Sequence, residues 1–209
     1  GPTMTIAGGS QRLPEAVAAS LSSQPRLGMT VRGILEDGDG VSIHCENETI
    51  RARHAICTIP FAALRHIPLA SAAMAKPVAR MAASLPYTRA TFAYIGAKTP
   101  FWREDGHPDT LWTDDPLIGR IFVLDDGSKG APPMLKLWTN GAGADLLDRM
   151  PQDAAARMIV ERIEAMRPAA RGQLNVLRFH SWQKSPFARG IYHHIGTGMA
   201  GDLAEATRF

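Results

Sequence analysis

The residues of this sequence that could do chemistry include an adjacent pair of histidines near the carboxyl end. His193 and His194 could ligate a metal ion or act as an acid and a base. Adjacent residues of a strand point to opposite faces, however, so the two rings cannot easily serve one ion. We therefore interpret the pair as structural and expect no metal site.

A glycine pair offers a second chemical possibility. Gly8-Gly9 is similar to part of a phosphate-binding loop, but no strand leads cleanly into it. The stronger signatures do not occur in the 209 residues: Gly-x-Gly-x-x-Gly, a Walker sequence, Cys-x-x-Cys, His-Glu-x-x-His and Gly-x-Ser-x-Gly. The sequence therefore predicts no self-contained nucleotide site, and it identifies no catalytic residue.

Aromatic side chains form the most concentrated chemical feature. They are Phe92, Tyr94, Phe101, Trp102, Trp112, Phe122, Trp138, Trp182 and Tyr192. Because aromatic residues dominate core burial, we expect most of them to pack in the interior.

Composition restricts the class of protein. Hydrophobic residues make up 45% of the chain and charged residues 21%, which is ordinary for a globular protein. The net charge of +3 carries no basic block, so we expect no nucleic-acid partner. No apolar run is long enough for a membrane span, and Cys45 and Cys57 are interpreted as buried thiols. We expect a soluble, cytoplasmic protein, and because the chain begins with Gly1 we expect it to be processed, tagged or cut from something longer.

The elements that must position these residues fall into three stretches. In the first, a short helix starts near Pro14 with Ser10 as its cap, and a meander covers residues 29–35, 41–45 and 49–52. A continuously apolar strand is predicted at 55–59, followed by a helix at 72–85 that Pro77 must kink or split.

The second stretch combines strands and helices. Strands are predicted at 91–97, 118–124, 134–138 and 174–179, with a turn at 125–130. Helices are predicted at 144–150 and from Pro151 to Met166, where Met158, Ile159, Ile163 and Met166 recur at helical spacing. The third stretch, Trp182–Phe209, is rich in glycine. The pattern as a whole indicates an α+β chain.

Six short motifs, in order along nearly the whole chain, resemble the flavin-dependent amine oxidases of the monoamine oxidase family. They are Ile6-Ala-Gly-Gly-Ser-Gln, Ala55-Ile-Cys-Thr-Ile-Pro, Leu85-Pro-Tyr-Thr, Pro100-Phe-Trp, Val123-Leu-Asp-Asp and Trp182-Gln-Lys-Ser-Pro-Phe-Ala-Arg-Gly-Ile-Tyr.

The resemblance implies a domain organisation. Residues 1–84 would be a middle segment of a split FAD-binding domain, with its meander and strand. Residues 85–181 would be a substrate-binding domain with a mixed β-sheet backed by helices, and residues 182–209 would begin the return to the FAD-binding domain. The amino-terminal dinucleotide motif and the carboxy-terminal flavin segment of the family are not found, so we expect an internal fragment that does not hold FAD tightly alone.

The resemblance also implies roles for individual residues. Val31, Trp182 and Tyr192 match positions that contact the cofactor, and Trp112, Phe122 and Tyr192 match positions that contact the substrate. The implied reaction oxidises a primary or secondary amine to an imine, with reduction of FAD and release of hydrogen peroxide. Each of these residues can equally be ordinary packing.

Two departures from the family pattern stand out. Ile191 occupies the position of the cysteine that bonds the flavin in mammalian monoamine oxidases, so FAD would be held non-covalently. The family lysine near the flavin aligns with Phe92 or Thr91, and Arg89 is the nearest basic residue.

A second hypothesis is that the chain is a non-catalytic binding module derived from such an oxidase. Exposed apolar surface would then be covered by self-association into a homo-oligomer.

Overall fold

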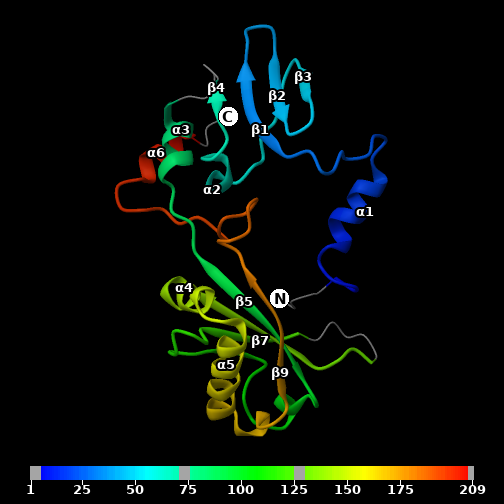
Figure 1. The fold of residues 1–209 in the computed structure, drawn as a ribbon, viewed down its shortest axis with the longest axis vertical. Coiled ribbons are helices and arrows are strands. Elements are labelled where there is room, and N and C mark those ends of the chain that lie inside the picture. The colour runs from blue at the N-terminus through cyan, green and yellow to red at the C-terminus, as the bar shows by residue number, and fades with distance from the viewer. Residues whose placement is uncertain (1–5, 71–75, 125–129, 207–209) are drawn as a thin grey trace. The chain divides into compact units, whose positions relative to one another are not determined.

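The structure is a computed structural model that describes residues 6–70, 76–124 and 130–206. Backbone contacts divide it into two compact units, each assembled from two separate stretches of sequence (Figure 1). Unit 1 combines Gly1–Pro25 with Arg89–Ser181, and unit 2 combines Arg26–Thr88 with Trp182–Phe209.

Unit 1 is built on a five-stranded sheet with the order β6-β7-β8-β5-β9. Its strands are β5 (Ala90–Ala97), β6 (Thr110–Trp112), β7 (Arg120–Leu124), β8 (Met134–Asn140) and β9 (Leu174–Ser181). The α+β class and the helix-backed sheet are confirmed. Every strand pairing in this sheet is antiparallel, however, so the expectation of a mixed sheet here was wrong.

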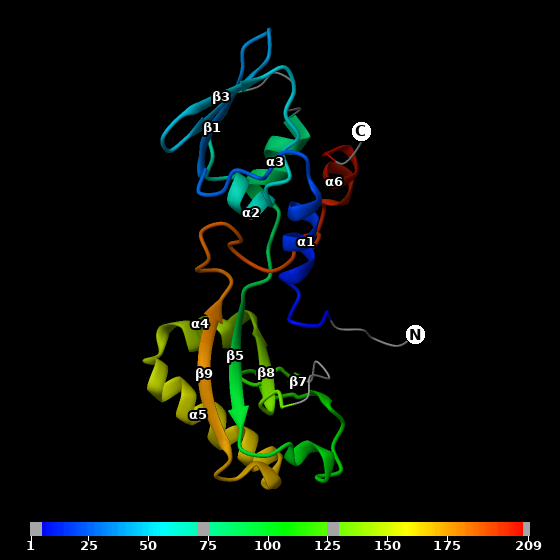
Figure 2. The same cartoon turned by 90° about the vertical axis from the view of Figure 1, so that its right-hand side faces the viewer.

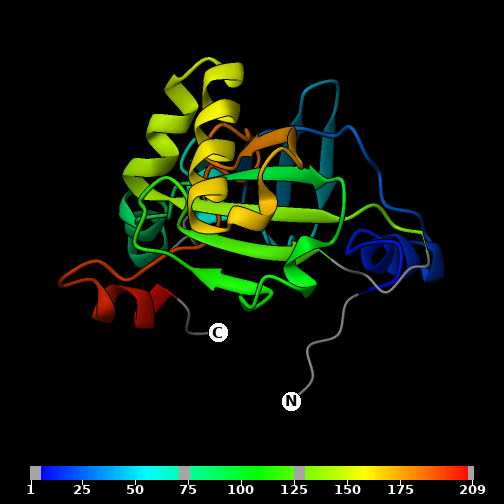
Figure 3. The same cartoon turned by 90° about the horizontal axis from the view of Figure 1, so that it is seen from below.

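Two helices cover one face of this sheet, as Figures 2 and 3 show. They are α4 (Gly141–Arg149) and α5 (Gln152–Met166), and Pro151 is the residue that caps α5. Ile159 and Ile163 are fully buried against the sheet, and Met158 and Met166 pack at the edge of the same core. The helical spacing read from the sequence is therefore confirmed, because the apolar side of α5 is the side that faces the strands.

The remaining elements of unit 1 are short. They are α1 (Arg12–Ser20) and two single 3-10 turns, η1 (Phe101–Arg103) and η2 (Pro168–Ala170). The residue that precedes α1 is Gln11, which makes no side-chain cap, so Ser10 was wrongly assigned as the cap. Instead, the Ser10 carbonyl accepts a hydrogen bond from the backbone N–H of Leu13.

Unit 2 contains a four-stranded sheet with the order β3-β2-β1-β4. Its strands are β1 (Val31–Glu36), β2 (Val41–Cys45), β3 (Thr49–Ala52) and β4 (Leu69–Ala70). The meander from β1 to β3 is confirmed. The strand predicted at residues 55–59 was wrong, because Ile56 is 94% exposed and the free edge of β1 pairs in parallel with β4 instead.

The helices of unit 2 are α2 (Phe61–Leu64), α3 (Lys76–Ser84) and α6 (Ala200–Ala206). Pro77 is the second described residue of α3, a position near a helix start where proline is tolerated, and the helix does not split over 76–84. Arg80 of α3 forms an ion pair of 2.9 Å with Asp202 of α6, a helix that the sequence did not predict. Residues 71–75 and the turn at 125–129 lie outside the described part.

Two further expectations are settled by burial and length. Cys45 and Cys57 are both free thiols, but Cys45 is half-buried and Cys57 is exposed, so their predicted burial was wrong. Among the described residues, no helix is long and apolar enough to cross a membrane.

Candidate functional site

The sheet of unit 1 has two chemically different faces. Alternate residues of a strand point to the same side of a sheet. Ile121, Leu135 and Leu137 point toward the helices and are fully buried. The residues between them point the other way and form a surface that we call the aromatic face: Phe92, Trp112, Arg120, Phe122, Lys136 and Trp138.

The strand register brings two of the predicted substrate residues into one neighbourhood. Trp112 on β6 pairs with Arg120 on β7, and Phe122 lies two residues further along β7 on the same side. Trp112 is 71% exposed, and Phe122 and Trp138 are half-buried. The rings of Phe122 and Trp138 stack with centroids 5.9 Å apart.

The expectation that most aromatic residues lie in the core was wrong. Of the nine in the cluster, only Phe92, Phe101 and Trp102 are buried. Strand alternation explains this, because a helix-covered sheet buries one face and leaves the aromatic side chains of the other face partly accessible.

Two positively charged side chains lie among these rings, and both contact the Phe122 ring. The Cζ atom of Arg120 lies 4.1 Å from the Phe122 centroid and 4.4 Å from the Trp112 centroid. The Nζ atom of Lys136 lies 4.6 Å from the Phe122 centroid, 5.3 Å from Phe92 and 5.7 Å from Trp138. Both cations therefore make cation–π contacts with the aromatic face.

The surroundings of Lys136 disfavour the charged form of its side chain. Burial, and to a lesser degree the positive charge of Arg120, lowers the pKa of Lys136 below its ordinary value. In the described part of the chain, neither Arg120 nor Lys136 has an ion-pair partner, and none of the five strands contains an aspartate or a glutamate. Among the described residues, the charged side chains on the strands of the aromatic face are thus all positive.

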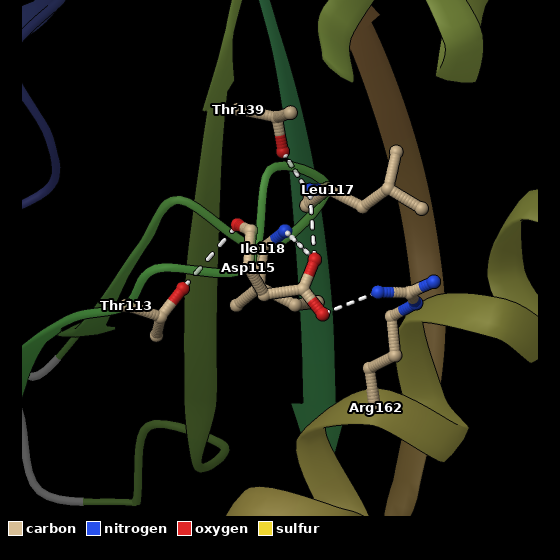
Figure 4. A network of polar contacts seen from close by, with 6 residues as sticks. All are labelled: Thr113, Asp115, Leu117, Ile118, Thr139 and Arg162. Carbon is tan, nitrogen blue, oxygen red and sulfur yellow. Dashed lines mark hydrogen bonds and ion pairs between the residues drawn. The ribbon is translucent and has the colours of Figure 1, made fainter.

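A polar network fixes the connection between β6 and β7 (Figure 4). The Asp115 carboxylate accepts a hydrogen bond of 2.8 Å from the backbone N–H of Leu117 and pairs with Arg162 of α5. Burial opposes ionisation here, but these two partners outweigh it and hold the pKa of Asp115 below its ordinary value. The Thr139 hydroxyl donates to the Leu117 carbonyl. The network ties the β6–β7 connection to β8 and α5, and so positions Trp112 and Arg120.

A second ion pair stabilises unit 1 away from the aromatic face. Arg167 is fully buried and donates two hydrogen bonds to Asp105, Nε to Oδ2 at 2.6 Å and Nη2 to Oδ1 at 2.9 Å. The Arg167 guanidinium, through its hydrogen bonds, holds the pKa of Asp105 below its ordinary value. This pair joins the loop after η1 to the junction between α5 and η2.

The cofactor residues implied by the resemblance all lie in unit 2. Val31 begins β1, where the pairing with β2 is irregular, and it is half-buried. Trp182 is half-buried, and its carbonyl accepts a hydrogen bond from the backbone N–H of Gly190. Tyr192 is exposed, and its carbonyl accepts from the N–H of Thr88.

The segment that carries Tyr192 is held by its backbone. Ile191 donates to the Thr88 carbonyl, and His194 donates to the Pro86 carbonyl. Gly190 has a φ of 142°, and a Cβ there would lie 2.9 Å from the Cβ of Tyr87, so only glycine fits this position. The backbone that carries Tyr192 is therefore held in place, while the Tyr192 side chain stays 48% exposed.

His193 and Arg89, two residues considered above for chemistry, each contact a neighbouring residue of their own unit. His193 lies across a β-bridge from Tyr87, with ring centroids 6.0 Å apart. In residues 6–70, 76–124 and 130–206, no three potential metal ligands gather at one point. Arg89 pairs with Asp145 at 3.1 Å. Lys136 is the basic group over Phe92, and the sequence analysis did not identify it. The alternation Arg-x-Phe and Lys-x-Trp in neighbouring strands could have indicated it.

Aromatic side chains with a few polar groups among them, as on this face, are the residue types that line small-molecule sites. The profile of the flavin containing amine oxidoreductases matches residues 1–208 of the chain. The chain therefore belongs to this family.

Individual relatives agree with this membership. The flavin-dependent L-tryptophan oxidase RebO of Lentzea aerocolonigenes is 27% identical over 172 residues, which are 79% of this chain and 36% of that protein. The chain thus spans about a third of the length of this relative.

Solved structures share the fold. Cyclohexylamine oxidase from Brevibacterium oxydans matches 96% of this chain and 44% of its own, with a TM-score of 0.74 and 22% identity. A putrescine oxidase bound to putrescine matches 89% of this chain and 41% of its own, with a TM-score of 0.70 and 18% identity.

Proposed function

We propose that this chain provides the substrate-binding part, and a portion of the FAD-binding part, of an enzyme that oxidises a primary or secondary amine to an imine and releases hydrogen peroxide. The observation that carries the proposal is the family match over residues 1–208, together with the aromatic face of unit 1. We assign residues 89–181 to the substrate domain and unit 2 to the flavin domain.

On this proposal the aromatic face contacts the substrate. The rings of Trp112 and Phe122 would pack against the apolar part of the amine and exclude water from it. No described acidic side chain lies on the strands of this face, so the amine would bind there in its neutral form or with its nitrogen pointing elsewhere.

Two residues of unit 2 fit an aromatic contact near a flavin ring: Tyr192 offers an exposed ring, and Trp182 is half-buried. Val31, which is also half-buried, would contact the adenine end of FAD through its backbone. Ile191 has no sulfur, so it cannot form a thioether, and FAD would be held without a covalent bond. When bound, the flavin supplies the acceptor for the hydride equivalent from the carbon that carries the amine.

The test uses the full-length protein that carries this sequence, purified with FAD. A panel of primary and secondary amines is mixed with it without oxygen, and the visible absorption of the flavin is followed. We expect bleaching by at least one amine and peroxide formation when air is admitted. Phe122→Ala should raise the KM for that amine, whereas Leu146→Ala, on an exposed position of α4, should not. A flavin that no amine bleaches would contradict the proposal.

A second candidate, a self-associating binding module, is favoured by one observation. Large apolar side chains of unit 2 are strongly exposed, namely Leu27 at 88%, Ile56 at 94% and Phe187 at 67%. A contiguous patch made by such side chains would mark a site of association. Sedimentation of the chain would show dimers or larger species if this candidate holds, and a strict monomer at all concentrations would exclude it.

A further inference from the structure

Two unpaired cations on an aromatic face require an explanation. Charged groups that are partly removed from water are normally paired with an opposite charge. Arg120 is half-buried, and its Nε atom is buried without a hydrogen-bond partner among the described residues. Lys136 is also half-buried, and the neighbouring positive charge of Arg120 opposes its own.

The rings around these cations orient them but do not neutralise them. Arg120 and Lys136 both make cation–π contacts with Phe122, at 4.1 and 4.6 Å from the ring centroid. Each contact is weak, and it leaves the net charge in place. Two positive groups therefore converge on one ring in a positive region, which is favourable for an anion.

The shape of the donors selects the kind of anion. A guanidinium presents a planar fork that matches a carboxylate in two parallel hydrogen bonds, and an ammonium adds a point charge. The surrounding rings of Trp112, Phe122 and Trp138 would accommodate an apolar or aromatic group attached to that carboxylate. The same positive charge would repel a second ammonium group on a ligand, which disfavours diamines.

We propose that Arg120 and Lys136 form a carboxylate-binding subsite on the aromatic face, so that the preferred substrate class is an amino acid with an apolar or aromatic side chain. The substrate part of this statement rests on the proposed amine oxidation. The carboxylate subsite itself depends only on unit 1 and can be tested without any reaction.

The test compares two probes of nearly equal shape on the full-length protein. 3-Phenylpropionate carries a carboxylate, and 3-phenylpropanamide carries a neutral amide in its place. Binding is measured by calorimetry at low salt. We expect the carboxylate to bind at least about tenfold more tightly than the amide, since hydrogen bonds to a charged partner are the stronger kind. This preference should decrease as salt is added.

Two single variants and a matched control locate the subsite. Arg120→Gln and Lys136→Met should each remove most of the preference for the carboxylate. Arg157→Gln is the control, because Arg157 lies on the exposed side of α5 in an ion pair with Asp153. Lys136→Met keeps the length of the side chain, so it remains informative if Arg120→Gln impairs folding.

The outcomes separate the two proposals. Equal binding of the two probes, or an unchanged preference in both variants, would overturn the subsite and leave amine oxidation untouched. Tighter binding of inorganic phosphate than of 3-phenylpropionate would also overturn it, since the site would then suit a phosphate group. Binding of the carboxylate through Arg120 and Lys136 without bleaching of the flavin by any amine would support the subsite and contradict the proposed function.

Discussion

The two faces of the unit 1 sheet differ in chemistry although the same strands form both. On one side, Ile121, Leu135 and Leu137 are fully buried against α4 and α5. On the other, Trp112, Phe122 and Trp138 share their surface with two cations. Because successive residues of a strand point to opposite faces, residues that stabilise the fold and residues that can contact a ligand alternate along the same strand. Substitutions on the covered face should change the free energy of unfolding, and substitutions on the aromatic face should change affinity.

The largest expected effect lies in the buried ion pair that supports the covered face. Asp105→Asn leaves the fully buried Arg167 guanidinium without its counter-charge, which costs about 3–5 kcal/mol in the free energy of unfolding. Urea unfolding monitored by circular dichroism measures this loss. Asp109→Asn is the control, since Asp109 is exposed. A loss as small as in that control would show that the pair does not stabilise the unit.

A smaller effect compares the faces directly. Leu137→Ala removes a fully buried side chain and should cost about 2–5 kcal/mol. Trp112→Ala removes an exposed ring and should cost less than about 1 kcal/mol, mostly its contact with Arg120. The same unfolding experiment measures both. If Trp112→Ala destabilised the protein as much as Leu137→Ala, the two faces would not differ in the way described.

Acid should weaken the covered side through the same ion pair. The pKa of Asp105 is lowered from 3.8, because Arg167 binds the charged form. A lowered pKa in the folded state adds stability above the unfolded pKa, and this stability is lost as pH falls through the folded value. Stability should therefore decrease below about pH 4, and the decrease should be shallower in Asp105→Asn. Thermal unfolding from pH 6 to pH 2 measures it, and parallel pH profiles of the two proteins would contradict it.

The last prediction concerns how the flavin is attached, and it requires no change to the fold. Because Ile191 offers no thiol, denaturing the full-length protein should release all its flavin into the filtrate of an ultrafiltration membrane. Absorbance of the filtrate measures this. Flavin that remains with the denatured chain would refute non-covalent binding.

Local patterns in the sequence predicted most elements, and contacts between distant strands decided the rest. Val41–Cys45 and Thr49–Ala52 form strands with the expected bounds, because alternation and turn residues specify them locally. The apolar run at 55–59 looked like a buried strand, but the edge of β1 is paired with β4. Hydrophobicity alone does not show which segment pairs with the edge strand of a sheet.

The site was partly readable from the sequence. The resemblance selected Trp112 and Phe122, which the register of β6 and β7 brings to one face. It gave no role to Arg120 or Lys136, because these two side chains come together only through the cross-strand pairing of Phe122 with Lys136. A sequence pattern shows the alternation within each strand but not which residues of two strands are opposite each other.

The most direct test of the account compares phenylalanine with 2-phenylethylamine, which differ only in the carboxylate. Each is mixed with the full-length, FAD-loaded protein without oxygen, and the rate of flavin bleaching is measured in the wild type, Arg120→Gln and Arg157→Gln. We expect faster bleaching by phenylalanine at low concentrations, and loss of this advantage in Arg120→Gln but not in Arg157→Gln. Bleaching that is faster with 2-phenylethylamine and unaffected by Arg120→Gln would contradict it.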